Sequence, residues 1–351
     1  MERMPLETQT LYAELVEHLV ANEAHRAIGH LPGCFTVKRV KGKRYYYYQY
    51  SDPGGVVRQV YAGRKSETLD RMVERFHEGR EAFKPDAERV QRLCAQLRAG
   101  GALLTDTSSG RVLKALSDSG VFSLEGVLLG TQAFSVLGNL LGMHWDHSAL
   151  RTQDIDIGST TGMSIALPFL KADVPKALDG LEMGFLPVPP LNPKHPSTSF
   201  IVRGSALRLD VLTPEKDPGR GDPVFLPRFN VAAQPLRFLD FLMADPVKGA
   251  VIDGGGVLVN VPQPARFALH KLIVFEERPV TAHAKGMKDL AQAAQLLKVL
   301  MDERPGDVLL AWEELRQRGS GWVKRVGNAL TASSDEYREV FEKAAAFLEL
   351  R

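Results

Sequence analysis

The segment Gln153-Asp154-Ile155-Asp156-Ile157 alternates carboxylate and apolar side chains, as a half-buried strand does. Side chains at positions i and i+2 of a strand project to the same face, so the two carboxylates point together while the two isoleucines face a core. Neighbouring carboxylates repel each other unless a divalent cation bridges them, and Mg²⁺ binds through oxygen ligands. The segment therefore predicts a metal site, although Asp-x-Asp also occurs by chance at exposed strand ends.

A third carboxylate, Asp210, lies in a second alternating strand, Leu207-Arg-Leu-Asp-Val-Leu212. A site for two metal ions needs such a further oxygen ligand. Asp210 can lie beside Asp154 and Asp156 if the two strands share a sheet. We therefore expect the three aspartates to gather at one place.

The segment Val127-Leu-Leu-Gly130-Thr131-Gln132-Ala133 has the pattern of a phosphate-binding turn. An apolar strand breaks at Gly130, and a helix begins with the hydroxyl residue Thr131 near its N-cap. The unpaired backbone N–H groups and the dipole of such a helix start favour phosphate. The alternative is an ordinary strand–helix turn that Thr131 caps.

Taken in this order, the three segments resemble the polymerase-β-type nucleotidyltransferase superfamily. The resemblance rests on Gly130-Thr131, on Asp154 with Asp156, and on Asp210, and it covers about residues 103–300. Thr131 stands where the superfamily has Gly or Ser. The gap from Thr131 to Asp154 is longer than in the minimal motif, which implies an extended helix and loop.

The sequence after Asp210 adds to this resemblance. Pro264-Ala-Arg-Phe-Ala-Leu-His-Lys271-Leu is similar to the helix that carries a triphosphate-binding lysine in abortive-infection-type nucleotidyltransferases, and Lys288-Asp289 resembles the Arg/Lys-Asp helix that follows it. With the Lys-Gly-Lys-Arg-Tyr-Tyr-Tyr segment at 41–47, the whole pattern also resembles a bacterial family of predicted nucleotidyltransferases. The alternative is a pair of amphipathic helices whose lysines reach into water.

The resemblance implies transfer of an NMP from an NTP to a hydroxyl, with Mg²⁺ or Mn²⁺ as cofactor. Two metal ions would be held by Asp154, Asp156 and Asp210, and Asp210 could also accept the proton of the attacking hydroxyl. The residues implied to contact the nucleotide are Gly130, Thr131, Gln132, Lys271 and Asp289.

The acceptor could be RNA or tRNA, a protein, or a small molecule, and a toxin- or defence-like role would match the abortive-infection relatives. The alternative function is a catalytically inactive module of the same fold that binds a nucleotide or a nucleic acid. The presence of all three acidic residues weighs against that alternative.

Basic and aromatic residues are concentrated between 36 and 65, where eight basic residues stand against one acidic residue, Asp52. Lys and Arg neutralise phosphates and Tyr stacks on unpaired bases, so this hairpin is a candidate nucleic-acid surface. The candidate residues are Lys41, Lys43, Arg44, Tyr46, Tyr48 and Arg58. The alternative is a half-buried sheet, because successive tyrosines of a strand face opposite sides.

The 351-residue chain is 44% hydrophobic and 25% charged with a net charge of +2, which excludes collagen-like, coiled-coil and wholly disordered classes. Its two cysteines, Cys34 and Cys94, form no metal-binding pattern and favour a reducing compartment. We find no signal-peptide core and no membrane span in the sequence, so we expect a cytoplasmic protein.

The expected fold is α/β (α+β) with a mixed sheet. It divides into an N-terminal helical extension with the basic hairpin at 1–102, a nucleotidyltransferase core at 103–262 and a helical domain at 263–351. Hydrophobic periodicity predicts helices at 7–30, 66–84, 86–99, 111–119, 130–141, 174–182, 264–276, 284–302, 306–317, 320–331 and 335–350. It predicts strands at 35–50 (with a turn at 41–43), 56–63, 122–129, 153–157, 199–203, 206–212, 249–252 and 257–260.

Overall fold

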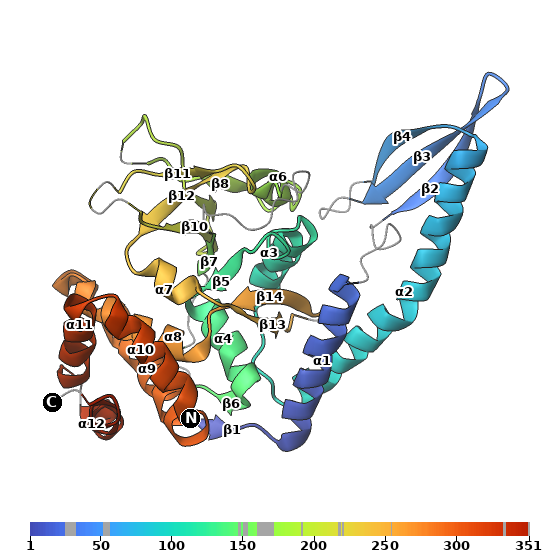
Figure 1. The fold of residues 1–351 in the computed structure, drawn as a ribbon. Helices are drawn as coiled ribbons and strands as arrows, with labels where there is room; N and C mark the ends of the chain where they lie inside the picture. The colour runs from blue at the N-terminus through green and yellow to red at the C-terminus, as the bar shows by residue number, and fades with distance from the viewer. Residues whose placement is uncertain are drawn as a thin grey trace.

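A central sheet lies between an N-terminal arm and a helical C-terminal part (Figure 1). The computed structural model describes residues 1–24, 33–51, 57–146, 149, 154–159, 172–190, 192–216, 219, 221–253, 255–332 and 335–349. In this described part the architecture is mixed α/β with a helical C-terminal region, as the sequence predicts. No helix within the same ranges is both long enough and apolar enough to cross a bilayer.

The central sheet is mixed, with parallel strands at its middle. Its described strands are β5 (Val127–Leu129), β7 (Asp154–Gly158), β8 (Phe185–Pro187), β9 (Ser199–Val202), β10 (Arg208–Pro214), β11 (Val224–Leu226) and β12 (Val231–Leu236). The order β11-β12-β10-β7-β5 places β7 and β10 side by side and parallel, while β5 runs antiparallel to β7. β9 pairs with β10 and β8 pairs with β9.

The alternation read in the sequence sets the two faces of β7 and β10. Ile155, Ile157, Leu209 and Val211 are at most 2% exposed and belong to the main hydrophobic core. The residues between them are half-buried on the opposite face. Burial of one face fixes the strand register, because a one-residue slip would exchange the carboxylates with the isoleucines.

Helices and a hairpin flank the sheet. They are α3 (Thr107–Asp118), α4 (Gly130–Leu141), α6 (Val174–Asp179), α7 (Leu239–Met243), and the antiparallel pair β13 (Val247–Val251) and β14 (Val257–Val261). The expected strand at 122–129 is wrong in its first half, where the chain turns and only 127–129 extend. The buried Asn260 amide donates to the carbonyls of Phe122 and Gly126, so these turn carbonyls bond to a side chain.

The C-terminal helices extend the same core. They are α8 (Pro264–Glu277), the 3₁₀ turn η2 (Val280–Ala282), α9 (His283–Glu303), α10 (Pro305–Gln317), α11 (Ser320–Thr331), the 3₁₀ turn η3 (Asp335–Tyr337) and α12 (Arg338–Phe347). The predicted helix positions are confirmed, with η3 opening the last helix. Buried residues of α8 through α12 join the sheet residues in one apolar cluster.

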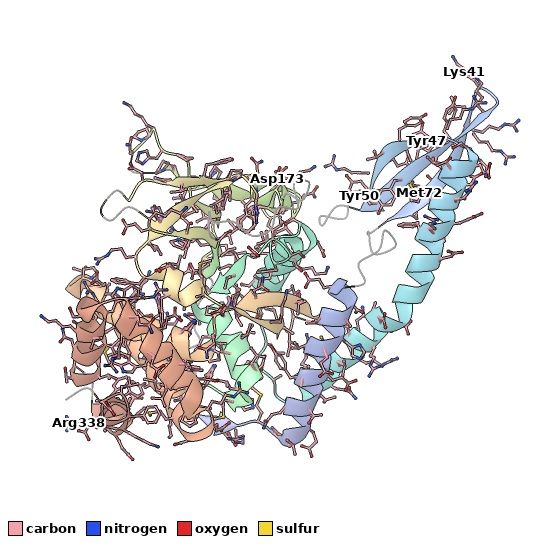
Figure 2. All side chains as sticks on the ribbon, in the orientation of Figure 1. Lys41, Tyr47, Tyr50, Met72, Asp173 and Arg338 are labelled. Carbon is pink, nitrogen blue, oxygen red and sulfur yellow. The ribbon has the colours of Figure 1, made fainter. Side chains whose placement is uncertain are left out.

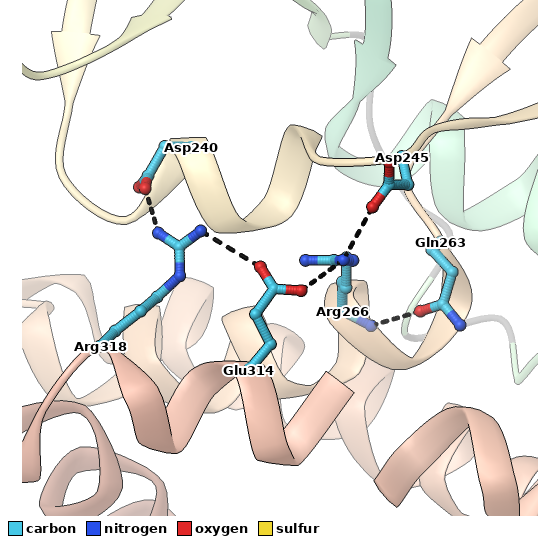
Figure 3. A network of polar contacts seen from close by, with 6 residues as sticks. All are labelled: Asp240, Asp245, Gln263, Arg266, Glu314 and Arg318. Atoms are coloured by element: carbon cyan, nitrogen blue, oxygen red, sulfur yellow. Dashed lines mark hydrogen bonds and ion pairs between the residues drawn. The ribbon is translucent and has the colours of Figure 1, made fainter. Parts of the chain in front are cut away.

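A polar network on one side of this region ties α7, α8 and α10 together (Figure 3). Glu314 on α10 accepts from Arg318, at 3.2 Å, and forms an ion pair with Arg266 on α8 at 2.5 Å. Arg318 also pairs with Asp240 on α7, and Arg266 pairs with Asp245 just beyond α7 at 3.1 Å. The network therefore docks the helical region onto the core through charged groups as well as apolar contacts.

The N-terminal arm consists of a long helix that carries a small sheet at its far end (Figure 1). Its elements are α1 (Leu6–Ala24), β2 (Cys34–Val40), β3 (Lys43–Ser51), β4 (Val57–Arg64) and α2 (Glu67–Ala99), and the short β1 (Glu2–Arg3) pairs with β6 (Met143–His144). Positive φ angles at Lys41 and Gly42 make the two-residue turn between β2 and β3, as predicted. The link between the strands predicted at 35–50 and 56–63 falls almost wholly outside the described residues.

The two helices expected at 66–84 and 86–99 are one helix of 33 residues that continues through Pro85. A proline removes one backbone hydrogen bond, but α2 packs against α1 at one end and against the three-stranded sheet at the other. Tyr12 fixes α1 to the body, because its hydroxyl donates to the Ala250 carbonyl at 2.8 Å and accepts from the Ala250 N–H at 2.9 Å.

Candidate active site

The three predicted aspartates come together on one face of the sheet. In the parallel register of β7 and β10, Asp156 is paired with Asp210 and Asp154 with Arg208. Neighbouring strands lie about 4.8 Å apart, so Asp156 and Asp210 are adjacent on the half-buried face. The pairing that the sequence left as an expectation is therefore present in the structure.

The electrostatics of Asp156 reflect this crowding. Burial and the Asp210 carboxylate raise the pKa of Asp156 to about 6, while the nearby Lys271 ammonium acts in the opposite direction. The Asp154 carboxylate also raises the pKa of Asp156, by less than Asp210 does. A site that concentrates negative charge in this way favours a cation.

Asp210 is held by two residues that the sequence reasoning did not single out. The Arg208 Nε–H lies 2.8 and 2.9 Å from the two Asp210 carboxylate oxygens, and the Ser199 hydroxyl on β9 donates to Oδ1. Arg208 also donates to the Ser199 hydroxyl at 2.9 Å. In the residues that the structure describes, no three His, Cys, Asp or Glu side chains stand in metal-ligand geometry. Arg208 could have been found from its place two residues before Asp210, on the same strand face.

The turn before α4 lies directly against Asp156. Leu129, the last residue of β5, pairs with Asp156, and Gly130 follows with a φ of +62°. A Cβ at Gly130 would lie only 2.2 Å from Asp156 Oδ2. Leu129 occupies the N-cap position without a side-chain cap, so the first N–H groups of α4 start beside the carboxylates.

Thr131 does not cap α4 as the sequence suggested. It is the second helical residue, its side chain is buried, and its hydroxyl lies 3.4 Å from the Gln292 side-chain amide of α9. Gln132 is also buried and contacts the Thr105 hydroxyl at 3.3 Å. The polar side chains of the turn thus hold α4 to its neighbours, and its backbone is the part available to a phosphate.

Lys271 on α8 faces the carboxylates and is held by Asp289 on α9. The Lys271 ammonium donates to Asp289 Oδ1 at 2.7 Å, and the Arg278 guanidinium donates to Oδ2. The Asp289 side chain is 3% exposed, so it contacts its two cations and little solvent. Burial acts to raise the pKa of Asp289, but Lys271 and Arg278 together lower it below its ordinary value.

Lys288 is a second cation at the site, which the sequence reasoning placed next to Asp289 without giving it a role. Burial and the Lys271 charge lower the pKa of Lys288, while Asp289, Asp154 and Asp156 act in the opposite direction. Lys288 lies four residues before Gln292 on α9, so both fall on the same side of the helix. That i, i+4 spacing is the signal that could have identified it.

The residues predicted to bind nucleic acid divide between the surfaces of the arm. Lys41, Lys43, Arg44 and Arg58 are exposed. Tyr46 and Tyr48 pack toward α2.

The α2-facing position of these two tyrosines is shown by their contacts. The Tyr46 hydroxyl donates to Asp70 at 2.6 Å, and the Tyr48 ring lies 6.0 Å from the ring of Phe76. On the opposite face of the sheet, Tyr61 is exposed and Tyr45 and Tyr47 are half-buried.

Comparison with known families decides how this geometry is classified. A family described as nucleotidyltransferase matches residues 107–317, which is more than half of the chain. The chain belongs to this nucleotidyltransferase family. The matched range includes the α4 turn, β7, β10 and the two lysine helices. Membership makes the protein an enzyme of the nucleotidyltransferase type and implies an NTP substrate and a divalent metal in general. No curated protein and no solved structure matches the chain.

Proposed function

We propose that this nucleotidyltransferase moves an NMP from an NTP to a hydroxyl acceptor with Mg²⁺ as its cofactor. The observation that carries the proposal is the pairing of Asp210 with Asp156 on adjacent parallel strands, with Asp154 on the same face. Asp210 is far from Asp154 and Asp156 in the sequence, and the sheet brings it beside Asp156, whose carboxylate lies against the helix start at Gly130.

In chemical type the three aspartates suit a hard divalent cation, although as described their side chains do not stand in metal-ligand geometry. The donor set is three carboxylates, and burial together with the Asp210 charge raises the pKa of Asp156. Mg²⁺ prefers oxygen ligands of this kind. Asp154, Asp156 and Asp210 would hold the metal. When bound, Mg²⁺ neutralises triphosphate charge and lowers the pKa of the attacking hydroxyl.

The chain's own residues supply the rest of the chemistry. The α4 N–H groups beside Gly130 bind phosphate oxygens, and Lys271 and Lys288 add positive charge on the side of α8 and α9. Asp289 holds Lys271 in place. Asp210, which Arg208 and Ser199 hold by hydrogen bonds, is the carboxylate that would accept the proton of the acceptor hydroxyl.

The acceptor and the biological role remain predictions of the sequence resemblance: RNA or tRNA, a protein or a small molecule, with a toxin- or defence-like role. Each acceptor class offers a hydroxyl, and the carboxylate face alone does not select among them.

Release of pyrophosphate tests the reaction class. The purified protein is incubated with Mg²⁺, each of the four NTPs in turn, and total cellular RNA, and pyrophosphate is measured. We expect release with at least one NTP from the wild type and none from Asp154→Ala, whose melting temperature should not fall. Equal release from the folded variant would contradict the role of the carboxylates.

A second candidate, an inactive nucleotide-binding module, is favoured by one observation: Arg208 occupies both oxygens of Asp210. If Arg208 only competes with the metal, Arg208→Gln should lower the Mn²⁺ concentration at half-stabilisation by roughly tenfold, which corresponds to about 1.4 kcal/mol. An active enzyme should show metal-dependent stabilisation in the wild type as well. Binding of NTP without pyrophosphate release in either protein would favour the inactive module.

A further inference from the structure

The sheet of the N-terminal arm has one face that packs on α2 and one that does not. Phe35 and Tyr48 contact the Phe76 ring at 5.1 and 6.0 Å, and Tyr46 bonds to Asp70, so these residues define the covered face. Side chains alternate along a strand, so the odd-numbered tyrosines of β3 lie on the opposite side. We call this opposite side the outer face.

Aromatic rings gather on the outer face. The Tyr61 ring of β4 lies 5.6 Å from Tyr47 and 6.0 Å from Tyr45, and Tyr47 is paired with Tyr61 in the strand register. Tyr61 is 57% exposed. The three tyrosines thus form a contiguous aromatic group in which Tyr45 and Tyr47 are half-buried and Tyr61 is exposed.

Cations and amides surround these rings. The Lys38 ammonium lies 5.0 Å from the centre of the Tyr47 ring and bonds to Gln59. The Gln59 amide donates to Gln49 at 2.8 Å. The outer face therefore combines flat π surfaces with hydrogen-bonding amides and positive charge.

The charge of this part of the arm is uniform. Among the described residues 33–51 and 57–65 there is no acidic side chain. The basic residues in those ranges are Lys38, Arg39, Lys41, Lys43, Arg44, Arg58, Arg64 and Lys65. Figure 2 shows Lys41 at the tip of the arm, with Tyr47 on the sheet between the tip and the body of the molecule.

We infer that the outer face binds a single strand of nucleic acid. Stacking on tyrosine needs unpaired bases, and the cations complement the phosphates that follow them along the strand. RNA and DNA single strands share this chemistry. The inference concerns binding by the arm and holds whether or not the proposed transfer reaction takes place.

Fluorescence anisotropy with a labelled 20-nucleotide single-stranded RNA tests the inference on the full chain. The same sequence as single-stranded DNA and as duplex DNA completes the set. We expect both single strands to bind more tightly than the duplex, with an affinity that falls as salt rises. A preference between the two single strands would identify the natural source of the ligand.

Paired variants test the rings. Tyr47→Ala/Tyr61→Ala should weaken single-strand binding by about tenfold or more, whereas Tyr47→Phe/Tyr61→Phe keeps the rings and should bind like the wild type. Equal melting temperatures would show that the arm is intact, and if Tyr47→Ala/Tyr61→Ala unfolds, Tyr61→Ala alone takes its place.

A triple variant tests the cations. Lys38→Gln/Lys41→Gln/Lys43→Gln should reduce the slope of log K against log salt by about 2, since a single strand contributes roughly 0.7 for each phosphate contact. Lys324→Gln, an exposed lysine on α11, is the control and should leave the slope unchanged.

Several outcomes would overturn the inference. They are no binding at low salt, equal affinity for the duplex, wild-type affinity in the alanine variant, or a dimer that dissociates when the tyrosines are removed. Loss of binding in the folded Asp154→Ala variant would also overturn it, because the strand would then occupy the carboxylate site rather than the arm.

Discussion

Gly130 has no space for a side chain because the Asp156 carboxylate fills it: a Cβ at this position would lie 2.2 Å from Oδ2. The same residue has a φ of +62°, a backbone angle that residues other than glycine rarely adopt. The turn and the carboxylate therefore position each other.

Gly130→Ala should damage both stability and activity for this reason. Gly204 is a matched control, since its φ is +77° but nothing lies within 4 Å of its Cβ position. We expect Gly130→Ala to lower the free energy of unfolding by about 1 kcal/mol more than Gly204→Ala, and to reduce nucleotidyl transfer about 100-fold through displacement of Asp156. Denaturant unfolding and initial rates measure the two effects. Equal behaviour of the two variants would show that the contact is unimportant.

Divalent cations should stabilise the folded protein through the three carboxylates. Mn²⁺ at ten times its dissociation constant should raise the free energy of unfolding by about 1.4 kcal/mol, which corresponds to a rise on the order of 2 °C in melting temperature. Asp156→Asn should abolish this increase, whereas Asp222→Asn, at an exposed position away from the site, should retain it. A metal-dependent increase that survives in Asp156→Asn would place the ion elsewhere.

Asp289 should act as a positioning residue for Lys271. Asp289→Asn leaves the Lys271 and Arg278 charges without their buried carboxylate. We therefore expect the free energy of unfolding to fall by about 3 kcal/mol and the KM for NTP to rise. Asp302→Asn breaks an exposed pair with Lys343 and should cost less than about 0.5 kcal/mol with no change in KM. If the two variants differ in neither quantity, the buried pair has no such role.

The network around Glu314 predicts a specific acid sensitivity. Hydrogen bonding to Arg266 lowers the pKa of Glu314 below its ordinary value of 4.5, with Arg318 adding to the effect. A lowered folded-state pKa contributes stability that is present above the ordinary value and is lost as pH falls through the folded pKa. Glu314→Gln should therefore lower the free energy of unfolding by about 1.5 kcal/mol near neutral pH. This difference in stability from the wild type should shrink below pH 4.5. A difference that stays constant down to pH 3 would contradict this account.

The sequence predicted the carboxylate face because the strands alternate strictly. To predict that Asp154, Asp156 and Asp210 share a face, it was enough to know that alternate residues of a strand face the same side and to assume that the two strands are neighbours. The parallel pairing of β7 with β10 confirms that assumption. Gly130 was also predictable as a turn, but its contact with Asp156 depends on how β5 pairs with β7.

Other features depend on tertiary packing that the pattern does not contain. Alternation along β3 places its tyrosines on two opposite faces, but only the docking of α2 decides which face is covered. A register shift between Tyr46 and Tyr47 also interrupts the regular pairing of β3 with β4. The helix through Pro85 depends on packing at both its ends. The long-range link between Thr131 and Gln292 joins residues that no local pattern relates.

The position of the label after transfer tests the central claim most directly. The protein is incubated with Mg²⁺ and each NTP carrying ³²P at either the α or the γ phosphate, together with total cellular RNA and a small-molecule extract. We expect α label, and no γ label, on RNA, on protein or on a small molecule, and none in the folded Asp154→Ala variant. Transfer of the γ label, equal transfer by Asp154→Ala, or no transfer from any NTP would contradict nucleotidyl transfer by these carboxylates.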